Sequence, residues 1–204
     1  MSRPPPRARP TPEQIAALPP YPGLPPSRIH VLSTPEHLAH AEARLRAAGP
    51  VGFDTESKPV FVAGAPQTGP HVIQFATATE AFIVQTRTPG VAEFLRAMVE
   101  GDAVVKVGFG LASDRPQLQR SLGLTLGRSV DLSHAVRRLG FKDAVGLKMA
   151  VAVVLGQRMS KSRKATTSNW AQATLTPQQL QYAANDAHAS LLVYQALAAE
   201  GLTA

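Results

Sequence analysis

Two carboxylates, Asp54 and Glu56, stand two residues apart in the segment Val51-Gly52-Phe53-Asp54-Thr55-Glu56. The apolar residues before them predict a β-strand, in which residues i and i+2 point to the same face. Two like charges at this separation repel each other unless a cation lies between them. The pair is therefore a candidate metal site, with a solvated turn at the end of a strand as the alternative.

Asp114 follows the apolar run 104–107 and the glycine-containing loop 108–113, where a helix is expected to begin. An aspartate at this position commonly caps a helix, and a role in a polar site is the alternative. Asp131 ends another expected strand, and helix capping is its predicted role.

Tyr182 and Asp186 are four residues apart in a segment that predicts a long helix, so they share one face of it. That face also carries small and apolar residues, which must pack on the sheet. A carboxylate on a buried face is unfavourable unless it is paired or binds a metal ion, and the sequence offers no basic residue nearby. His188, two residues after Asp186, is expected to face solvent.

These side chains must be positioned by alternating strands and helices. Short apolar runs predict five strands, at Pro50–Asp54, His71–Ala76, Ala81–Gln85, Ala103–Val107 and Ser129–Leu132. Helical patterns cover Pro35–Ala48, Val91–Glu100, Arg115–Leu122, Ser133–Leu139, Gly146–Leu155 and Pro177–Ala199. Short links between the first three strands predict an antiparallel meander, and the later helices predict parallel crossovers. We therefore expect an α/β fold, a mixed five-stranded sheet with helices on both faces.

The chain has 204 residues, 44% hydrophobic and 17% charged, which favours one soluble domain. It contains no cysteine, which excludes disulfides and thiolate-bound zinc. No membrane partner is expected, because no apolar run is long enough to span a bilayer. We expect a cytoplasmic protein, associated with the nucleoid if bacterial; the arginine-rich start leaves organelle targeting open.

Ten of the 18 prolines lie within residues 1–26, together with several arginines. Proline fixes φ and removes backbone donors, so residues 1–27 are predicted to be a flexible tail and residues 28–204 the folded domain. The tail is also a possible ligand for a protein partner.

The net charge of +7 is concentrated in residues 137–164, which hold eight basic residues and one acidic residue. Such a segment attracts a phosphate backbone, whereas the alternative is a solvated helical surface. The candidates for nucleic-acid contacts are Lys148, Arg158, Lys161, Arg163 and Lys164. Trp170 follows them and could stack on a base, although packing is the favoured role.

Together these residues resemble the DEDD superfamily of 3′-5′ exonucleases in its tyrosine-bearing branch, which includes the Werner-syndrome-type exonuclease domain and ribonuclease D. The resemblance covers roughly residues 28–200. It rests on Phe53-Asp54-Thr55-Glu56, Lys106-Val107-Gly108-x-Gly110-x-x-x-Asp114, Gly146-Leu147-Lys148, Ser168-Asn169-Trp170 and Tyr182-Ala183-Ala184-x-Asp186-Ala187.

This resemblance implies a ribonuclease H-like fold and two divalent cations in the active site. It assigns Asp54 to both cations, Glu56 and Asp186 to the first, and Asp114 to the second. It makes Tyr182 the residue that orients or deprotonates the attacking water. Oxygen ligands without cysteine favour Mg²⁺ or Mn²⁺ over zinc.

The leading hypothesis is a metal-dependent exonuclease that removes nucleotides from the 3′ end of DNA or RNA. Its nucleic-acid partner is single-stranded or has duplex 3′ ends, and degradation of short oligoribonucleotides is an alternative. A non-catalytic nucleic-acid-binding module and a DNA repair or proofreading accessory tethered by the tail are the other hypotheses. The chain ends soon after the last helix, which leads us to expect no additional helical RNA-binding domain.

Overall fold

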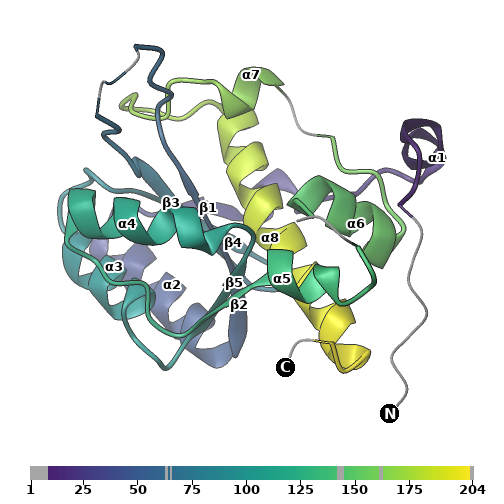
Figure 1. Cartoon of the computed structure of the whole chain (residues 1–204). Coiled ribbons are helices and arrows are strands. Elements are labelled where there is room, and N and C mark those ends of the chain that lie inside the picture. Colours follow the sequence, from purple (N-terminus) through teal and green to yellow (C-terminus); the bar gives the residue numbers. More distant parts are fainter. Residues whose placement is uncertain (1–8, 63, 65, 142–144, 161–162, 203–204) are drawn as a thin grey trace.

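The computed structural model describes residues 9–62, 64, 66–141, 145–160 and 163–202, with side chains in the last range from Ala165 onward. Its centre is a six-stranded mixed sheet (Figure 1). The strands are β1 (Ile29–Val31), β2 (Pro50–Glu56), β3 (Val72–Ala76), β4 (Ala81–Gln85), β5 (Val105–Gly108) and β6 (Ser129–Asp131).

The sheet combines a meander with parallel crossovers, in the order β1-β4-β3-β2-β5-β6. Strands β2, β3 and β4 are antiparallel to their neighbours in this series, whereas β5 runs parallel to β2 and β6 parallel to β5. The register places Asp54 opposite Gln74 and Glu56 opposite Val72. The predicted α/β architecture with a mixed sheet is confirmed.

The sixth strand corrects the prediction of five. Strand β1 lies at the edge of the sheet, parallel to β4, with Ile29 opposite Ala81. Its three residues directly follow a proline-rich stretch, and so short a segment has no measurable hydrophobic alternation. Pairing with β4 is a tertiary contact that nothing local in the sequence indicates.

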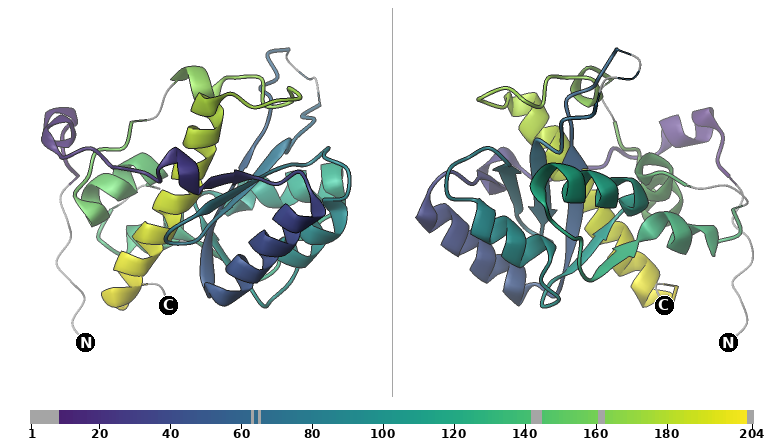
Figure 2. Two further views of the ribbon diagram at one scale, coloured as in Figure 1. Left: turned by 180° about the vertical axis from the view of Figure 1, so that it is seen from behind. Right: turned by 60° about the vertical axis from the view of Figure 1, so that its left-hand side comes forward.

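Helices cover both faces of the sheet (Figure 2). One face packs on α2 (Pro35–Ala47), α3 (Ala92–Val99) and α4 (Leu111–Leu122) through a core that includes Phe53, Phe75 and Phe94. The other face packs on α5 (Leu132–Arg137), α6 (Leu147–Leu155) and α8 (Pro177–Ala199). No helix in the described ranges is long and apolar enough to cross a membrane.

The bounds of α8 agree with the prediction, because its start carries strong local signals. The side chain of Thr176 accepts a hydrogen bond from the Gln179 amide, Gln179 completes a capping box, and Pro177 occupies the first turn. Helix α4 instead begins four residues earlier than expected, at Leu111, and holds Pro116 inside it. Helices α1 (Pro12–Ala17) and α7 (Arg163–Thr166) were not predicted.

The described part of the proline-rich segment makes contacts with the rest of the chain that its composition did not indicate. The amide of Tyr21 donates to the carbonyl of Arg158, and the amide of Arg158 donates to the carbonyl of Pro19. Leu24 is buried. Pro20 and Arg158 thus form an isolated parallel bridge outside the sheet, in which the proline has no amide to donate. The domain boundary after residue 27 stays a prediction.

Candidate metal centre and nucleic-acid contacts

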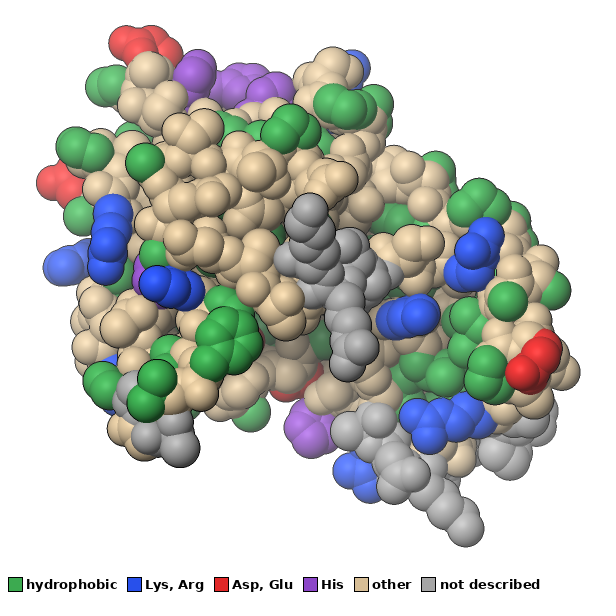
Figure 3. Space-filling view, turned by 90° about the horizontal axis from the view of Figure 1, so that it is seen from above, with side chains coloured by type: hydrophobic (Ala, Val, Ile, Leu, Met, Phe, Trp, Pro, Cys, Tyr) green, Lys and Arg blue, Asp and Glu red, His purple; other side chains and the backbone are tan. Residues whose placement is uncertain are grey.

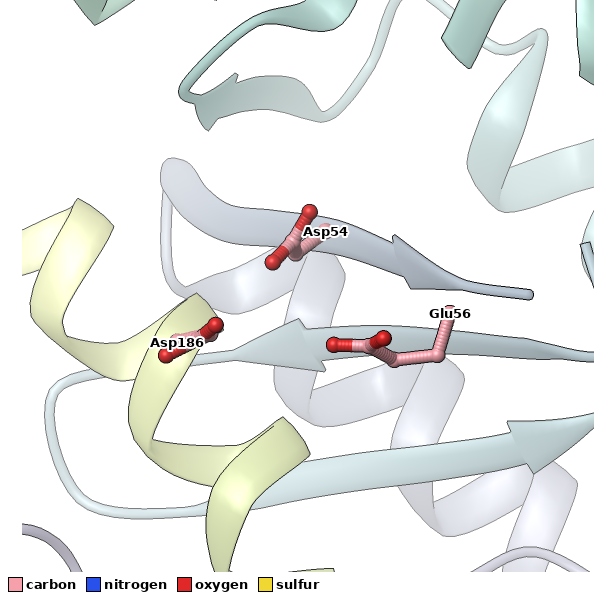
Figure 4. Close-up of side chains that lie close together, drawn as sticks. All are labelled: Asp54, Glu56 and Asp186. Atoms are coloured by element: carbon pink, nitrogen blue, oxygen red, sulfur yellow. The ribbon is translucent and has the colours of Figure 1, made fainter. Parts of the chain in front are cut away.

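Strand β2 and helix α8 bring three acidic side chains to one point (Figure 4). Asp54 and Glu56 project from the same face of β2, as their spacing predicted, and Asp186 projects toward them from α8. One carboxylate oxygen of each lies within 4.8 Å of the others. Asp54 and Glu56 are half-buried, and Asp186 is 2% exposed.

Gly52 explains how α8 comes this close to β2. A Cβ atom built on Gly52 would lie 1.8 Å from the carbonyl oxygen of Ala187, closer than any real contact. The helix therefore packs directly on the strand backbone, helped by the small buried residues Ala183, Ala184 and Ala187. This close approach carries Asp186 to the acids of β2.

Asp114 is not among the three acids that converge, and it contacts their strand through Thr55. It occupies the first turn of α4, where the helix dipole favours a negative charge. The hydroxyl of Thr55 donates to its Oδ1 at 2.6 Å, which ties Asp114 to the residue between Asp54 and Glu56. Burial, followed by the charge of Asp131, raises the pKa of Asp114 despite this hydrogen bond.

Tyr182 lies one turn before Asp186 on α8, so the two share the face expected from their spacing. The hydroxyl of Thr166 donates to the Tyr182 hydroxyl at 3.2 Å. The ring of Tyr182 lies 5.9 Å from that of Trp170, centroid to centroid. Trp170 is fully buried, which confirms the packing role over base stacking.

The donor set of this site fits a hard divalent cation. Carboxylate oxygens are the ligands that Mg²⁺ and similar ions take, and the three acids converge within the span of one ion's coordination shell. Three carboxylates at this separation would repel one another without a positive charge among them. We call Asp54, Glu56 and Asp186 the acidic centre.

His188 contradicts its sequence prediction, because it is buried rather than solvent-facing. Its Nδ1 lies 2.5 Å from the hydroxyl of Tyr21, and its Nε2 lies 3.1 Å from the carbonyl oxygen of Ala78. Burial lowers the pKa of His188, and burial together with the charge of Asp186 raises that of Tyr21. The prediction was wrong because a segment 167 residues away covers this side of α8.

The candidate nucleic-acid contacts are less well defined than the acids. Lys148 is exposed in the first turn of α6, and Arg158 is half-buried beside the proline-rich segment. Lys161 and the side chains of Arg163 and Lys164 lie outside the described residues. On the face that Figure 3 shows, the lysine and arginine side chains drawn in colour are spread widely instead of forming one patch.

Sequence reasoning overlooked one polar residue near the acidic centre, Gln74. Gln74 lies fully buried in β3, opposite Asp54. The sequence feature that could have indicated it is a single amide side chain within the apolar run Val72-Ile73-Gln74-Phe75-Ala76. Asp131 does cap α5, as predicted, by accepting from the Ser133 amide at 3.0 Å, but it also accepts from the Gly110 amide before α4. That second contact links the positions of the two helices.

Comparison with known sequences identifies a family match over most of the chain. Residues 29–201 match the 3′-5′ exonuclease family. A bifunctional 3′-5′ exonuclease/ATP-dependent helicase WRN of Mus musculus is 31% identical over 164 residues, which are 79% of this chain and 12% of that protein. A 3′-5′ exonuclease of Arabidopsis thaliana is 29% identical over 149 residues, 72% of this chain and 52% of that protein.

A ribonuclease D of Xanthomonas oryzae is 28% identical over 155 residues, 74% of this chain and 40% of that protein. The chain thus spans about half or less of the length of these curated relatives.

Solved structures share the fold. The Nibbler EXO domain of Aedes aegypti matches with a TM-score of 0.70 and 23% identity, covering 87% of this chain and 90% of that one. Ribonuclease D of Escherichia coli matches with a TM-score of 0.71 and 19% identity, covering 84% of this chain and 44% of that one. The expected ribonuclease H-like fold is therefore confirmed.

Proposed function

Because the chain belongs to the 3′-5′ exonuclease family, we propose that it hydrolyses phosphodiester bonds at the 3′ end of a nucleic-acid strand, one nucleotide at a time. The observation that carries the proposal is the acidic centre, where Asp54, Glu56 and Asp186 converge from two elements. A non-catalytic binding module would have no need of three carboxylates held together against their mutual repulsion.

Two divalent cations, Mg²⁺ or Mn²⁺, would be held by these acids and by Asp114. When bound, such cations activate water and neutralise the charge that develops on the attacking and leaving oxygens. Asp54 would contact both positions, while Glu56 and Asp186 would complete the first. Asp114, whose Oδ1 accepts from the hydroxyl of Thr55 at 2.6 Å, would serve the second directly or through water.

Tyr182 would orient the attacking water or help to take up its proton. Its hydroxyl is held at 3.2 Å by the hydroxyl of Thr166, and its ring packs against the buried Trp170. A group fixed in this way needs little reorganisation during the reaction, which is what general acid-base catalysis requires. This role of Tyr182 would assign the chain to the tyrosine-bearing branch of the superfamily.

The substrate is a DNA or RNA strand with an accessible 3′ end. The names of the relatives include both a helicase-linked exonuclease and a ribonuclease. The basic segment 137–164, with Lys148, Arg158, Lys161, Arg163 and Lys164, would supply phosphate contacts that position the strand without selecting its sequence.

A degradation ladder tests this function. DNA and RNA oligonucleotides labelled at the 5′ end are incubated with the full chain and Mg²⁺ or Mn²⁺, beside the variant Asp54→Ala. We expect one-nucleotide shortening from the 3′ end that disappears in the variant and in EDTA. Activity that survives EDTA, or equal activity in Asp54→Ala, would overturn the proposal. Glu93→Gln, which changes an exposed acid on α3, is the matched control and should keep full activity.

A further inference from the structure

Gln74 has a buried amide that the described structure leaves without hydrogen bonds. The residue is 0% exposed, and neither Oε1 nor Nε2 has a partner. A buried polar group without partners destabilises a fold, and an apolar side chain of the same size would avoid that penalty. Such groups are uncommon in native proteins, and a role in a functional site is one reason for which they are kept.

The position of Gln74 relates it to the acidic centre. In the β2–β3 register it stands directly opposite Asp54. Directly opposed residues of antiparallel strands share a face, with their Cβ atoms roughly 4.5–5.5 Å apart. Val72 and Ala76, two residues before and after Gln74, pack in the core beneath α8. Gln74 therefore points to the face of the sheet that carries Asp54 and Glu56 and is covered by α8, the helix of Asp186.

Strand β4, on the other side of β3, shows that the face of the sheet beneath α8 does not itself require an amide. The β4 residue opposite Gln74 is Ile83, which is fully buried in the same core. The α8 residues of that core are mainly alanines, which offer no side-chain partner. What distinguishes Gln74 from Ile83 is that its other neighbour is Asp54.

A backbone hydrogen bond already constrains the orientation of Asp54. Its Oδ1 accepts from the Thr55 amide at 2.9 Å. An amide beside a metal-binding carboxylate can fix the orientation of that carboxylate by donating to it, as outer partners of metal ligands commonly do.

We propose that Gln74 is a positioning residue of the metal centre, whose amide gains its hydrogen bonds, with Asp54 as acceptor, when the acidic centre holds a divalent cation. The inference rests on the proposed function. Without metal, the unsatisfied amide of Gln74 lowers the stability of the fold. With metal, the same amide fixes the orientation of the Asp54 carboxylate.

The variant Gln74→Met tests both the effect of the amide on stability and its effect on metal affinity. It keeps the length of the side chain and removes the amide. We expect the melting temperature without metal to rise by roughly 2–8 °C, because the unsatisfied group is gone. We expect the dissociation constant for Mn²⁺, measured by calorimetry without substrate, to rise by about tenfold or more. Gln74→Leu serves as a second variant with the same expectations.

Gln85→Met is the matched control. Gln85 lies on the same face, opposite Val72 on β4, and its amide already donates to the carbonyl of Gln172 at 2.9 Å. Its loss should leave the melting temperature equal or lower and the Mn²⁺ affinity unchanged.

The results separate this inference from the proposed function. If wild type binds Mn²⁺ and both Gln74 variants bind it equally well, the positioning role is wrong and the exonuclease proposal stands. A lower melting temperature without metal in both variants would also overturn it, because the amide would then have a structural role. If wild type binds no Mn²⁺, both proposals fail.

Discussion

The acidic centre and the basic segment 137–164 are built in opposite ways. The acids stand on β2 and α8, partly or fully buried, with their directions set by the strand and helix backbone. Among the basic residues, Lys148 lies exposed at the start of a helix and Arg158 lies between helices. Metal coordination needs atoms placed within a fraction of an ångström, whereas attraction of a polyanion needs only charge nearby.

This difference predicts how sensitive each region is to change. Substitutions in the acidic centre should act on the chemical step and on metal affinity. Substitutions in the basic segment should act on binding strength and its salt dependence. Each variant can therefore be judged by whether it changes the chemical step and metal affinity, or the binding strength and its salt dependence.

The largest effect is expected for Asp186→Asn. It removes the charge of a proposed metal ligand at a buried position, so kcat/KM should fall by about 10³-fold or more. Stability without metal should be equal or higher, because like-charge repulsion is reduced. Steady-state kinetics and thermal melting measure the two. Loss of activity together with a large loss of stability would instead point to a structural role.

The second-largest effect is expected for Gly52→Ala, which changes the packing of α8 without replacing any of the acids. The added Cβ would collide with the carbonyl oxygen of Ala187, so α8 must shift. We expect activity to fall by about 100-fold and the free energy of unfolding by about 1–3 kcal/mol. Gly146→Ala is the control, since nothing lies within 4 Å of its added Cβ. Equal effects at the two glycines would contradict the close-packing argument.

Tyr182→Phe separates catalysis from metal binding. Removal of the hydroxyl should lower kcat by about 100-fold while Mn²⁺ affinity stays unchanged. Single-turnover rates and calorimetry check the two expectations. Tyr194→Phe makes the same change on the same helix, three turns later, and should have no effect on rate. An unchanged kcat in Tyr182→Phe would remove the tyrosine from the mechanism.

The basic segment is tested by replacing Lys161, Arg163 and Lys164 together with alanine. The slope of log K against log salt for a single strand should become shallower by about 2. Single-turnover kcat at saturating substrate should stay within about twofold, because these cations hold the strand on the protein and take no part in the chemical step. Arg96→Ala with Arg120→Ala, both exposed elsewhere, is the control. A salt slope unchanged by the triple variant would assign these residues to a solvated surface.

Lys106 is a basic residue in a strand, and its predicted effect is on stability alone. It is fully buried in β5, its Nζ donates to the carbonyl of Gly101, and burial lowers its pKa to about 8. Between pH 8 and 10 the unfolded chain keeps this proton and the folded chain loses it. The free energy of unfolding should therefore rise with pH, by at most about 1.4 kcal/mol per unit.

Chemical denaturation at four pH values measures this rise, and Lys106→Met should abolish it. The same rise in the variant would assign the pH dependence to another group.

Local patterns predicted the parts of the fold that local physics controls. The start of helix α8 was predicted correctly because Thr176 and Pro177 define it. Strand β1 was missed because only its pairing with β4 makes it a strand. The burial of His188 was missed because Tyr21, far away in sequence, covers it.

The sequence by itself determined which pairs of side chains point to the same face of a strand or helix, because their spacing along the chain sets this. Asp54 with Glu56, and Tyr182 with Asp186, share a face because the periods of a strand and a helix require it. Only the tertiary structure decided that these two faces meet, through the contact between Gly52 and Ala187. It also decided that Gln74 lies opposite Asp54. Backbone periodicity is local, whereas register and close packing depend on segments that are distant in the chain.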